Sequence, residues 1–220
     1  MDYPSPNAAD FNEVTVLNTA FLALLKDDRA AAVLLAGLSA DTAGKLSGLT
    51  ETQSQRLASA PFLLFSLREA DDQYWDEVQS DGASYSLFAA SGVGSIDGNR
   101  LVSASLGYIW QMAQRNPYTL RLICCASLYW CERISDQPLM HVISRATGRD
   151  DLLELRAGTE SGVWRRLLDS GLSRRNDVWL ATQYSVLQAL LMVSPAKRDT
   201  AWKSAACRTR VPVISRRADE

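Results

Sequence analysis

The sequence predicts an all-α protein with two helical parts. Apolar residues recur at steps of three and four over most of the chain, which is typical of amphipathic helices. Ser, Thr and Asn residues that can cap helices precede several of these segments. Residues 81–99 are instead rich in Gly and Ser with little periodicity, and they predict a linker or long loop. We therefore expect a helical module over residues 1–80, a second helical domain over 100–195 and a loosely ordered basic tail over 196–220.

The first expected helix covers residues 12–37. Lys26, Asp27, Asp28 and Arg29 fall where its exposed face would need charged side chains, and Gly37 supplies a stop signal. Its apolar residues share one face at helical spacing: Val14, Leu17, Phe21, Leu24 and Leu25.

Two short helices should follow, each announced by a capping residue. Ser39 predicts the N-cap of a helix over residues 40–47. Thr50 begins the next helix, because Gln53 three residues later completes the Thr-x-x-Gln pattern of a capping box. We expect this helix to end before Pro61.

The middle of the chain changes character several times. Residues 62–68 form a short apolar run that fits either a strand or the start of a helix, and residues 69–78 form an acidic helical segment. Helical periodicity resumes over residues 100–114, and Asn116-Pro117 should end that helix. The apolar stripe of this helix is Val102, Leu106, Ile109, Trp110 and Ala113.

Residues 118–134 are apolar around most of the helical circumference, which predicts one central buried helix. Ser135, with Pro138 just inside the start, predicts another helix that ends near Gly148. Three further helices are expected, over residues 150–157, 161–170 and 173–193.

Residues with catalytic or ligand-binding chemistry are few. The single histidine, His141, lies between apolar neighbours and is expected to be partly buried and hydrogen-bonded rather than a general base. The glycine-rich residues 92–99 lack the Lys-Ser or Lys-Thr pair of a phosphate loop. The cysteines lack zinc-site spacing and are expected to be reduced core thiols: Cys124, Cys125, Cys131 and Cys207. The sequence therefore predicts a protein that is not an enzyme, with no catalytic residue, cofactor or metal.

The N-terminal residues do not resemble a secretory signal, because Asp2 stands where a basic region would be expected and no apolar run follows. The longest apolar runs reach only about half the length of a bilayer span. We therefore expect a soluble, cytoplasmic protein without membrane contact.

Charge is distributed unevenly along the chain. Residues 1–100 contain 6 Lys and Arg against 14 Asp and Glu, whereas residues 101–220 contain 17 against 11. A basic C-terminal half is typical of a surface for nucleic acid or an acidic partner. The alternative is that the two halves simply attract one another.

Residues 163–183 loosely resemble a helix-turn-helix, with Gly171 in the turn. In that motif the second helix offers its first turn to the major groove. Asp177 departs from the pattern because a buried aliphatic residue is expected there, so a capped core helix is the alternative. The tail could equally be solubilising. The expected DNA-contacting residues are Arg165, Arg166, Ser173, Arg174, Arg175 and, in the tail, Arg208 and Arg210.

A set of residues in the N-terminal part resembles a known family at matching offsets. They are Asp28-Arg29-Ala30-Ala31-Ala32, Gly37-Leu38, Ala43, Leu46, Leu49-Thr50, Gln53, Leu57-Ala58, Leu63 and Arg68. Upstream, Leu17-Asn18 and Phe21-Leu22 also resemble the family's first helix when one helical turn is skipped. Over about residues 17–70 the chain thus resembles the core of the flagellar transcriptional activator FlhD.

The resemblance implies an all-α protein that dimerises through this region, binds an FlhC-like regulator and activates transcription with it. Small residues at such positions suit close approach of helices from two protomers. The residues expected at the dimer or partner interface are Phe21, Ala30, Ala31, Ala32, Gly37, Ala43, Leu46 and Leu57.

Two departures from the family keep a second function open. Phe65 stands where the family can carry a cysteine, so no intersubunit disulfide is expected, and the family's DNA-contacting helix has no counterpart beyond about residue 80. The first hypothesis is a regulator that contacts DNA through its basic half. The alternative is an adaptor or anti-activator that does not bind DNA and uses its acidic half to bind regulator subunits.

Overall fold

The computed structural model describes residues 7–80, 96–146, 149, 151–158 and 161–193. Its helices are α1 Ala8–Leu24, α2 Asp28–Leu34, α3 Ala40–Ser47, α4 Glu51–Ala58, α5 Asp72–Ser80, α6 Ile96–Arg115, α7 Pro117–Cys124, α8 Leu128–Ser135, α9 Leu139–Ala146, α10 Ser161–Asp169 and α11 Asn176–Val193. Two short strands, β1 Phe65–Ser66 and β2 Glu154–Leu155, form an antiparallel pair. The all-α prediction is confirmed. In the described part of the chain, no helix combines the length and the apolar character needed to cross a membrane.

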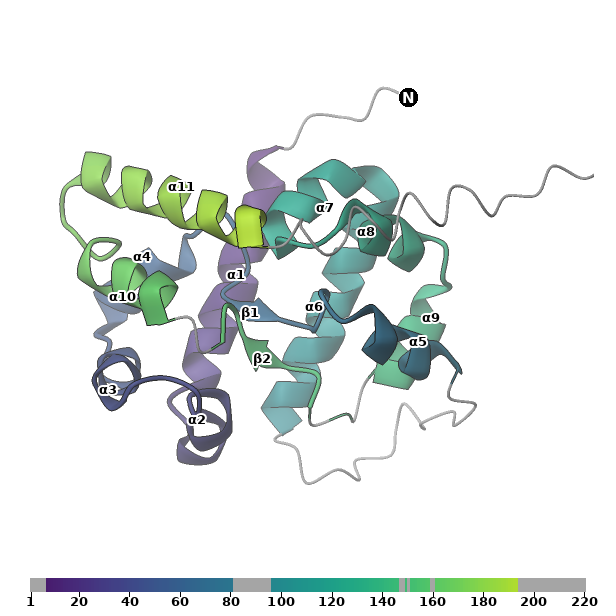
Figure 1. The fold of residues 1–220 in the computed structure, drawn as a ribbon, viewed down its shortest axis with the longest axis horizontal. Helices are drawn as coiled ribbons and strands as arrows, with labels where there is room; N and C mark the ends of the chain where they lie inside the picture. The colour runs from purple at the N-terminus through teal and green to yellow at the C-terminus, as the bar shows by residue number, and fades with distance from the viewer. Residues whose placement is uncertain (1–6, 81–95, 147–148, 150, 159–160, 194–220) are drawn as a thin grey trace, which may run out of the picture.

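Helix α1 runs through the middle of the molecule (Figure 1). Helices α2, α3, α4, α10 and α11 lie on one side of it in this view, and α5 to α9 lie on the other. The short strands β1 and β2 lie between the two groups. Segments from both ends of the chain therefore contribute to the first group.

The single helix predicted over residues 12–37 is wrong, because the chain forms two helices there. Helix α1 begins with a capping box in which Asn7 and Asp10 each accept the other's backbone N–H. After α1 ends, the Asp27 side chain accepts the Arg29 backbone N–H at 2.9 Å and starts α2. An Asp side chain that bonds backbone in this way favours a cap over a helix interior.

The two capped helices predicted next are confirmed. The Ser39 side chain accepts the Thr42 backbone N–H at 3.4 Å at the start of α3. The Thr50 side chain accepts the Gln53 N–H at 3.3 Å, and the Gln53 side chain accepts the Thr50 N–H at 2.9 Å at the start of α4. These short helices are thus specified by local residues.

The single central helix predicted over residues 118–134 is also wrong. Helix α7 ends at Cys124, and Cys125 adopts a left-handed backbone conformation with φ 49°. Ser127 then caps α8 by accepting the Trp130 backbone N–H at 3.1 Å. The break lets both short helices direct apolar side chains into the core, where Ile123 and Trp130 are fully buried.

Residues 150–157 do not form the predicted helix, because they supply β2. Phe65 pairs with Leu155 and Ser66 with Glu154, and the Arg156 backbone N–H donates to the Leu64 carbonyl at 3.1 Å. The apolar run over residues 62–68 is therefore strand-forming at its centre. The pairing partner lies far away in the sequence, so local periodicity does not predict it.

Several boundaries differ from their predicted places. Residues 96–99, expected in the linker, form the first turn of α6, and the remainder of that linker lies outside the described residues. His141 is exposed on α9, not partly buried as expected, because the inward face of this short helix is occupied by Val142 and Ala146. The tail over 196–220, with Cys207, Arg208 and Arg210, also lies outside the described residues.

One hydrophobic core contains side chains from both predicted parts of the chain. Trp75 of α5 and Trp130 of α8 meet edge to face, with ring centroids 5.7 Å apart. The fully buried Asn18 amide on α1 donates to the Ala58 and Phe62 carbonyls at 3.1 and 2.9 Å. The division into two domains at residues 81–99 stays a prediction.

The described cysteines, Cys124, Cys125 and Cys131, are buried free thiols, as expected. Burial raises the pKa of the Cys124 thiol well above its ordinary value, so this group is protonated at neutral pH. These side chains act as small apolar groups in the core.

Candidate functional site

The arginines of the expected helix-turn-helix lie on the outside of the molecule. Arg165 and Arg166 are exposed on α10, whose inward face buries Trp164. Arg174 and Arg175 are exposed in the connection between α10 and α11, two helices that pack on each other. The fold thus places four basic side chains on and beside one pair of helices.

The start of α11 corrects the predicted motif. The helix begins at Asn176, so Ser173, Arg174 and Arg175 precede it and do not form its first turn. The Ser173 hydroxyl accepts the Arg175 backbone N–H at 3.3 Å, a local turn that competes with helix formation. The arginines are therefore presented by a loop.

Arg175 forms an ion pair with Asp177 on the surface. The two side chains are joined by hydrogen bonds of 3.2 and 2.6 Å, and this contact lowers the pKa of the Asp177 carboxyl. Both groups are exposed, so water and salt screen the pair. A phosphate could replace the Asp177 carboxylate on the Arg175 guanidinium, because both ligands offer paired oxygens.

Helix α11 is held against α4 near its N-terminus. The Arg56 guanidinium lies 5.4 Å from the centre of the Trp179 ring and donates to the Asn176 side chain at 3.2 Å. The outer side of α11 carries exposed apolar side chains: Leu180, Tyr184 and Met192. A surface of this composition is more typical of a contact with protein than with nucleic acid.

The residues expected at a dimer or partner interface separate into two groups. One group is buried inside the protomer: Phe21, Leu46 and Leu57. The other group reaches the surface, half-buried at Ala30, Ala31 and Ala43 and exposed at Ala32 and Gly37. Only the second group is accessible to another chain, and the first group belongs to the core of the protomer.

Helix α2 exposes Asp28, Arg29, Ala32 and Val33 to solvent, and Gly37 follows the helix, so this surface combines charged, small and aliphatic residues. Ala32 and Gly37 are exposed, and the Val33 side chain is 72% exposed. Leu35, at the helix C-cap, is buried and anchors this segment on the core. Small residues such as Ala32 let another backbone approach closely.

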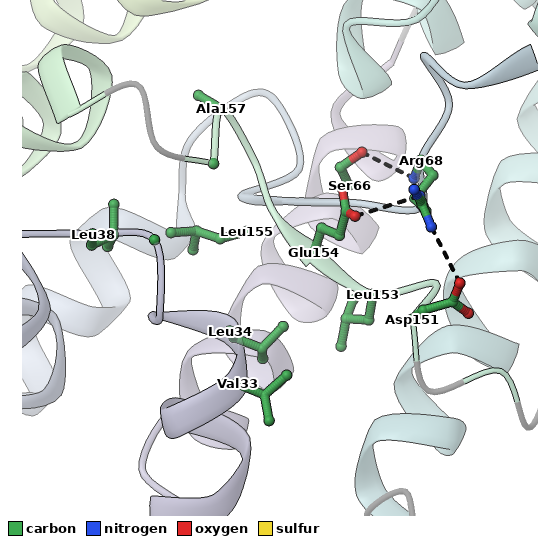
Figure 2. A pocket seen from close by; sticks show the side chains of 12 residues that line it. Val33, Leu34, Leu38, Ser66, Arg68, Asp151, Leu153, Glu154, Leu155 and Ala157 are labelled. Carbon is green, nitrogen blue, oxygen red and sulfur yellow. Dashed lines mark hydrogen bonds and ion pairs between the residues drawn. The ribbon is translucent and has the colours of Figure 1, made fainter. Parts of the chain in front are cut away.

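A groove of about 630 Å³ lies between α2 and the β1–β2 pair (Figure 2). Figure 2 shows the α2 side chains on one wall and those of the β2 segment on the other. Both walls are largely aliphatic, with Val33, Leu34 and Leu38 on one side and Leu153, Leu155 and Ala157 on the other. Such a groove suits an apolar side chain or a short extended segment.

The polar end of this groove is built around Arg68. Its guanidinium lies 3.3 Å from Asp71, 3.2 Å from Asp151 and 3.4 Å from Glu154. It also stacks over the Tyr74 ring, 4.4 Å from its centre. A second guanidinium, that of Arg149, lies 5.7 Å from the centre of the same ring. Three carboxylates thus face two guanidinium groups, and the local charge is negative.

The pKa values of two groups at this end of the groove are raised by burial and by the neighbouring carboxylates. Burial raises the pKa of the Glu154 carboxyl; Arg68 opposes the shift, whereas Asp71 and Asp151 add to it. Burial also raises the pKa of the Tyr74 hydroxyl, which donates to Asp151 at 3.0 Å. A cation bound beside Glu154 would relieve the repulsion among these carboxylates.

The helix predicted over residues 150–157 gives no indication of this groove, because the groove depends on strand β2. The alternation Leu153-Glu154-Leu155-Arg156 has the period of a strand and could have indicated it. No local signal announces that Arg68 adopts a left-handed conformation, with φ 55°, beside these residues.

Comparison with known proteins identifies one family in the N-terminal part of the chain. The family model described as flagellar transcriptional activator (FlhD) matches residues 6–95. No curated protein and no solved structure matched the chain. The match includes α1 to α5 and extends beyond residues 17–70, on which the resemblance was noted. Over residues 6–95 this chain therefore resembles FlhD, a family of transcriptional regulators and not of enzymes.

Proposed function

We propose that this protein is an FlhD-like bacterial transcriptional regulator. The observation that carries the proposal is the match of residues 6–95 to the flagellar transcriptional activator family. In this proposal the N-terminal helices associate with a second copy, and an FlhC-like regulator completes the DNA-binding complex. The protein acts in the cytoplasm and has no catalytic role.

DNA contact is assigned in this proposal to the basic surface of α10 and the loop before α11. Arg165, Arg166, Arg174 and Arg175 are exposed there, and Ser173 lies beside them. Arg208 and Arg210 of the tail would add contacts to phosphates. Because these groups are presented by a helix and a loop, we expect mainly phosphate binding with modest reading of base edges.

The test is fluorescence anisotropy of a labelled promoter-length duplex with the full chain at low and high salt. We expect binding at low salt that weakens steeply as salt rises, since phosphate contacts release counterions. Arg175→Ala should weaken binding and reduce the salt dependence. Arg100→Ala is the matched control, because Arg100 is also exposed and also forms an ion pair with an aspartate, Asp97.

Equal affinities of the Arg175→Ala and Arg100→Ala variants would remove the α10–α11 surface from the proposal. Absence of binding at low salt, with and without an FlhC-like regulator, would contradict DNA contact altogether. That outcome favours the adaptor or anti-activator, which binds regulator subunits without binding DNA. The exposed apolar side of α11, with Leu180, Tyr184 and Met192, supports this second function because it resembles a protein-contact surface.

A further inference from the structure

The groove between α2 and β2 places two kinds of chemistry side by side. Its walls are aliphatic, and its Arg68 end carries the carboxylates of Asp151 and Glu154 (Figure 2). Val33 leaves 72% of its side-chain surface open to solvent on the rim. A ligand that complements the groove has branched aliphatic side chains with a cationic group directly beside them.

The chain itself contains a segment with this composition. Residues 210–217 read Arg-Val-Pro-Val-Ile-Ser-Arg-Arg, an aliphatic run with arginines on both sides. Branched residues favour an extended backbone, and Pro212 restricts Val211 to extended conformations. An extended segment of this kind projects aliphatic side chains on alternate sides and fits a narrow groove.

We propose that residues 210–217 of the same chain bind in the groove between α2 and β2. The aliphatic run lies between Val33 and Leu38 on one side and Leu155 on the other. An arginine at one end of the segment lies beside Asp151 and Glu154, where three carboxylates face two guanidinium groups. This assignment rests on the groove and its charge and does not depend on the proposed function.

The connecting chain is long enough for this contact. Helix α11 ends at Val193, so residues 194–209 separate it from the proposed segment. At about 3.3 Å per extended residue, this connection spans up to about 50 Å. A folded chain of this length has a radius of gyration of about 17 Å, so the connection is longer than a quarter of the way around the molecule.

The arginine of the segment that pairs with Asp151 and Glu154 cannot contact a DNA phosphate at the same time. If the tail contacts phosphates as proposed above, the bound segment withholds this arginine from DNA. The groove would then compete with DNA for the tail. Because the groove and the tail belong to the same chain, the groove has a high effective concentration for this segment.

Disulfide trapping in the full chain tests the contact. One variant combines Val33→Cys and Val213→Cys with Cys207→Ser. It is incubated in a glutathione redox buffer, and peptide mapping measures the rate at which the intrachain disulfide forms. Val33 is exposed, so its replacement leaves the core unchanged. The control pairs Val213→Cys with Val16→Cys, because Val16 lies on α1 and is 61% exposed.

We expect the disulfide to Val33→Cys to form about fivefold or more faster than the disulfide to Val16→Cys, because docking raises the local concentration of the segment. Adding Asp151→Asn and Glu154→Gln should remove most of this advantage while leaving the aliphatic walls in place. Equal rates at the two positions would overturn the proposal. A dimer linked between Val33→Cys of one copy and Val213→Cys of another as the main product would overturn it too, since the segment would then come from another copy.

Discussion

Arg156 is the most consequential single side chain that connects the two parts of the chain. It is 6% exposed, and its guanidinium forms a 3.0 Å ion pair with the buried Glu69. The same guanidinium donates to the carbonyls of Leu63, Phe65 and Cys124. One side chain from the β2 segment therefore satisfies polar groups on the β1 segment and at the end of α7.

Arg156→Met should strongly destabilise the protein. The variant leaves the Glu69 carboxylate buried without its cation and leaves three carbonyls without a donor, which typically costs about 3–5 kcal/mol. Urea unfolding followed by Trp fluorescence measures the effect as a lower midpoint.

The control for this prediction is Arg68→Met, which also removes an arginine that pairs with carboxylates. Arg68 pairs with Asp71, Asp151 and Glu154, whose side chains are 41% to 60% exposed, so water replaces the lost guanidinium. The loss of stability should be clearly smaller than for Arg156→Met. Comparable losses would show that burial does not set the strength of the Arg156 pair.

At the residue scale, the sequence predicts which charged side chains are exposed better than it predicts which ones are buried. Arg165, Arg166, Arg174 and Arg175 are exposed, as a DNA-contacting role requires. Arg156 is indistinguishable from them in the sequence, because its burial depends on partners 32 to 93 residues away along the chain. The prediction that His141 is partly buried is wrong, because its apolar neighbours in sequence lie on other faces of the helix and His141 is exposed.

At the scale of elements, the sequence predicts α3 and α4 but misses the starts of α2 and α8, whose caps Asp27 and Ser127 lie within longer helical patterns, and it misses pairings between distant segments. Helices α3 and α4 form where Ser39 and Thr50 announce them. Strand β2 depends on Phe65, ninety positions before Leu155, and no local pattern specifies this partner. The break at Cys125 is equally hidden, since the left-handed residue is not glycine and only Ser127 after it hints at a new helix.

Thr50→Ala should shorten or destabilise α4. The substitution removes the oxygen that accepts the Gln53 N–H and half of a reciprocal capping box, which costs about 1 kcal/mol. Thr52→Ala is the control, because Thr52 is exposed inside the same helix, where alanine is the better helix former. A lower urea midpoint for Thr50→Ala alone is expected. If Thr52→Ala lowers the midpoint equally, the capping box does not stabilise α4.

At the scale of the whole molecule, the N-terminal part that resembles FlhD is packed into a core with the C-terminal helices. Leu64 and Trp75 share this core with Leu106 and Trp164. The predicted interface residues are consequently divided: Phe21, Leu46 and Leu57 are buried by the protomer itself, and the accessible ones lie in α2, just after it at Gly37 and in α3 at Ala43. The pattern of small residues in the sequence does not distinguish packing within a chain from packing between chains, since both require close approach.

The proposed self-association through α2 would depend on side chains that the protomer leaves exposed. Ala32 lies in this helix with Val33 beside it, and neither is covered by the described part of the chain. A two-fold axis through this surface would bring two α2 helices together at Ala32, where a small side chain permits close approach. A bulky side chain at Ala32 would hold the helices apart without disturbing the protomer core.

Ala32→Trp should raise the dissociation constant of the dimer about tenfold or more, because overpacking a close helix contact costs about 1–3 kcal/mol. Sedimentation equilibrium over a range of concentrations measures this shift. Ala104→Trp is the matched control, since Ala104 is an exposed alanine on α6, outside the residues that resemble FlhD. Identical dissociation constants for the two variants would place any dimer contact away from α2. A wild-type chain that stays monomeric at every concentration would contradict self-association, and the exposed surface of α2 would then be left for an FlhC-like regulator.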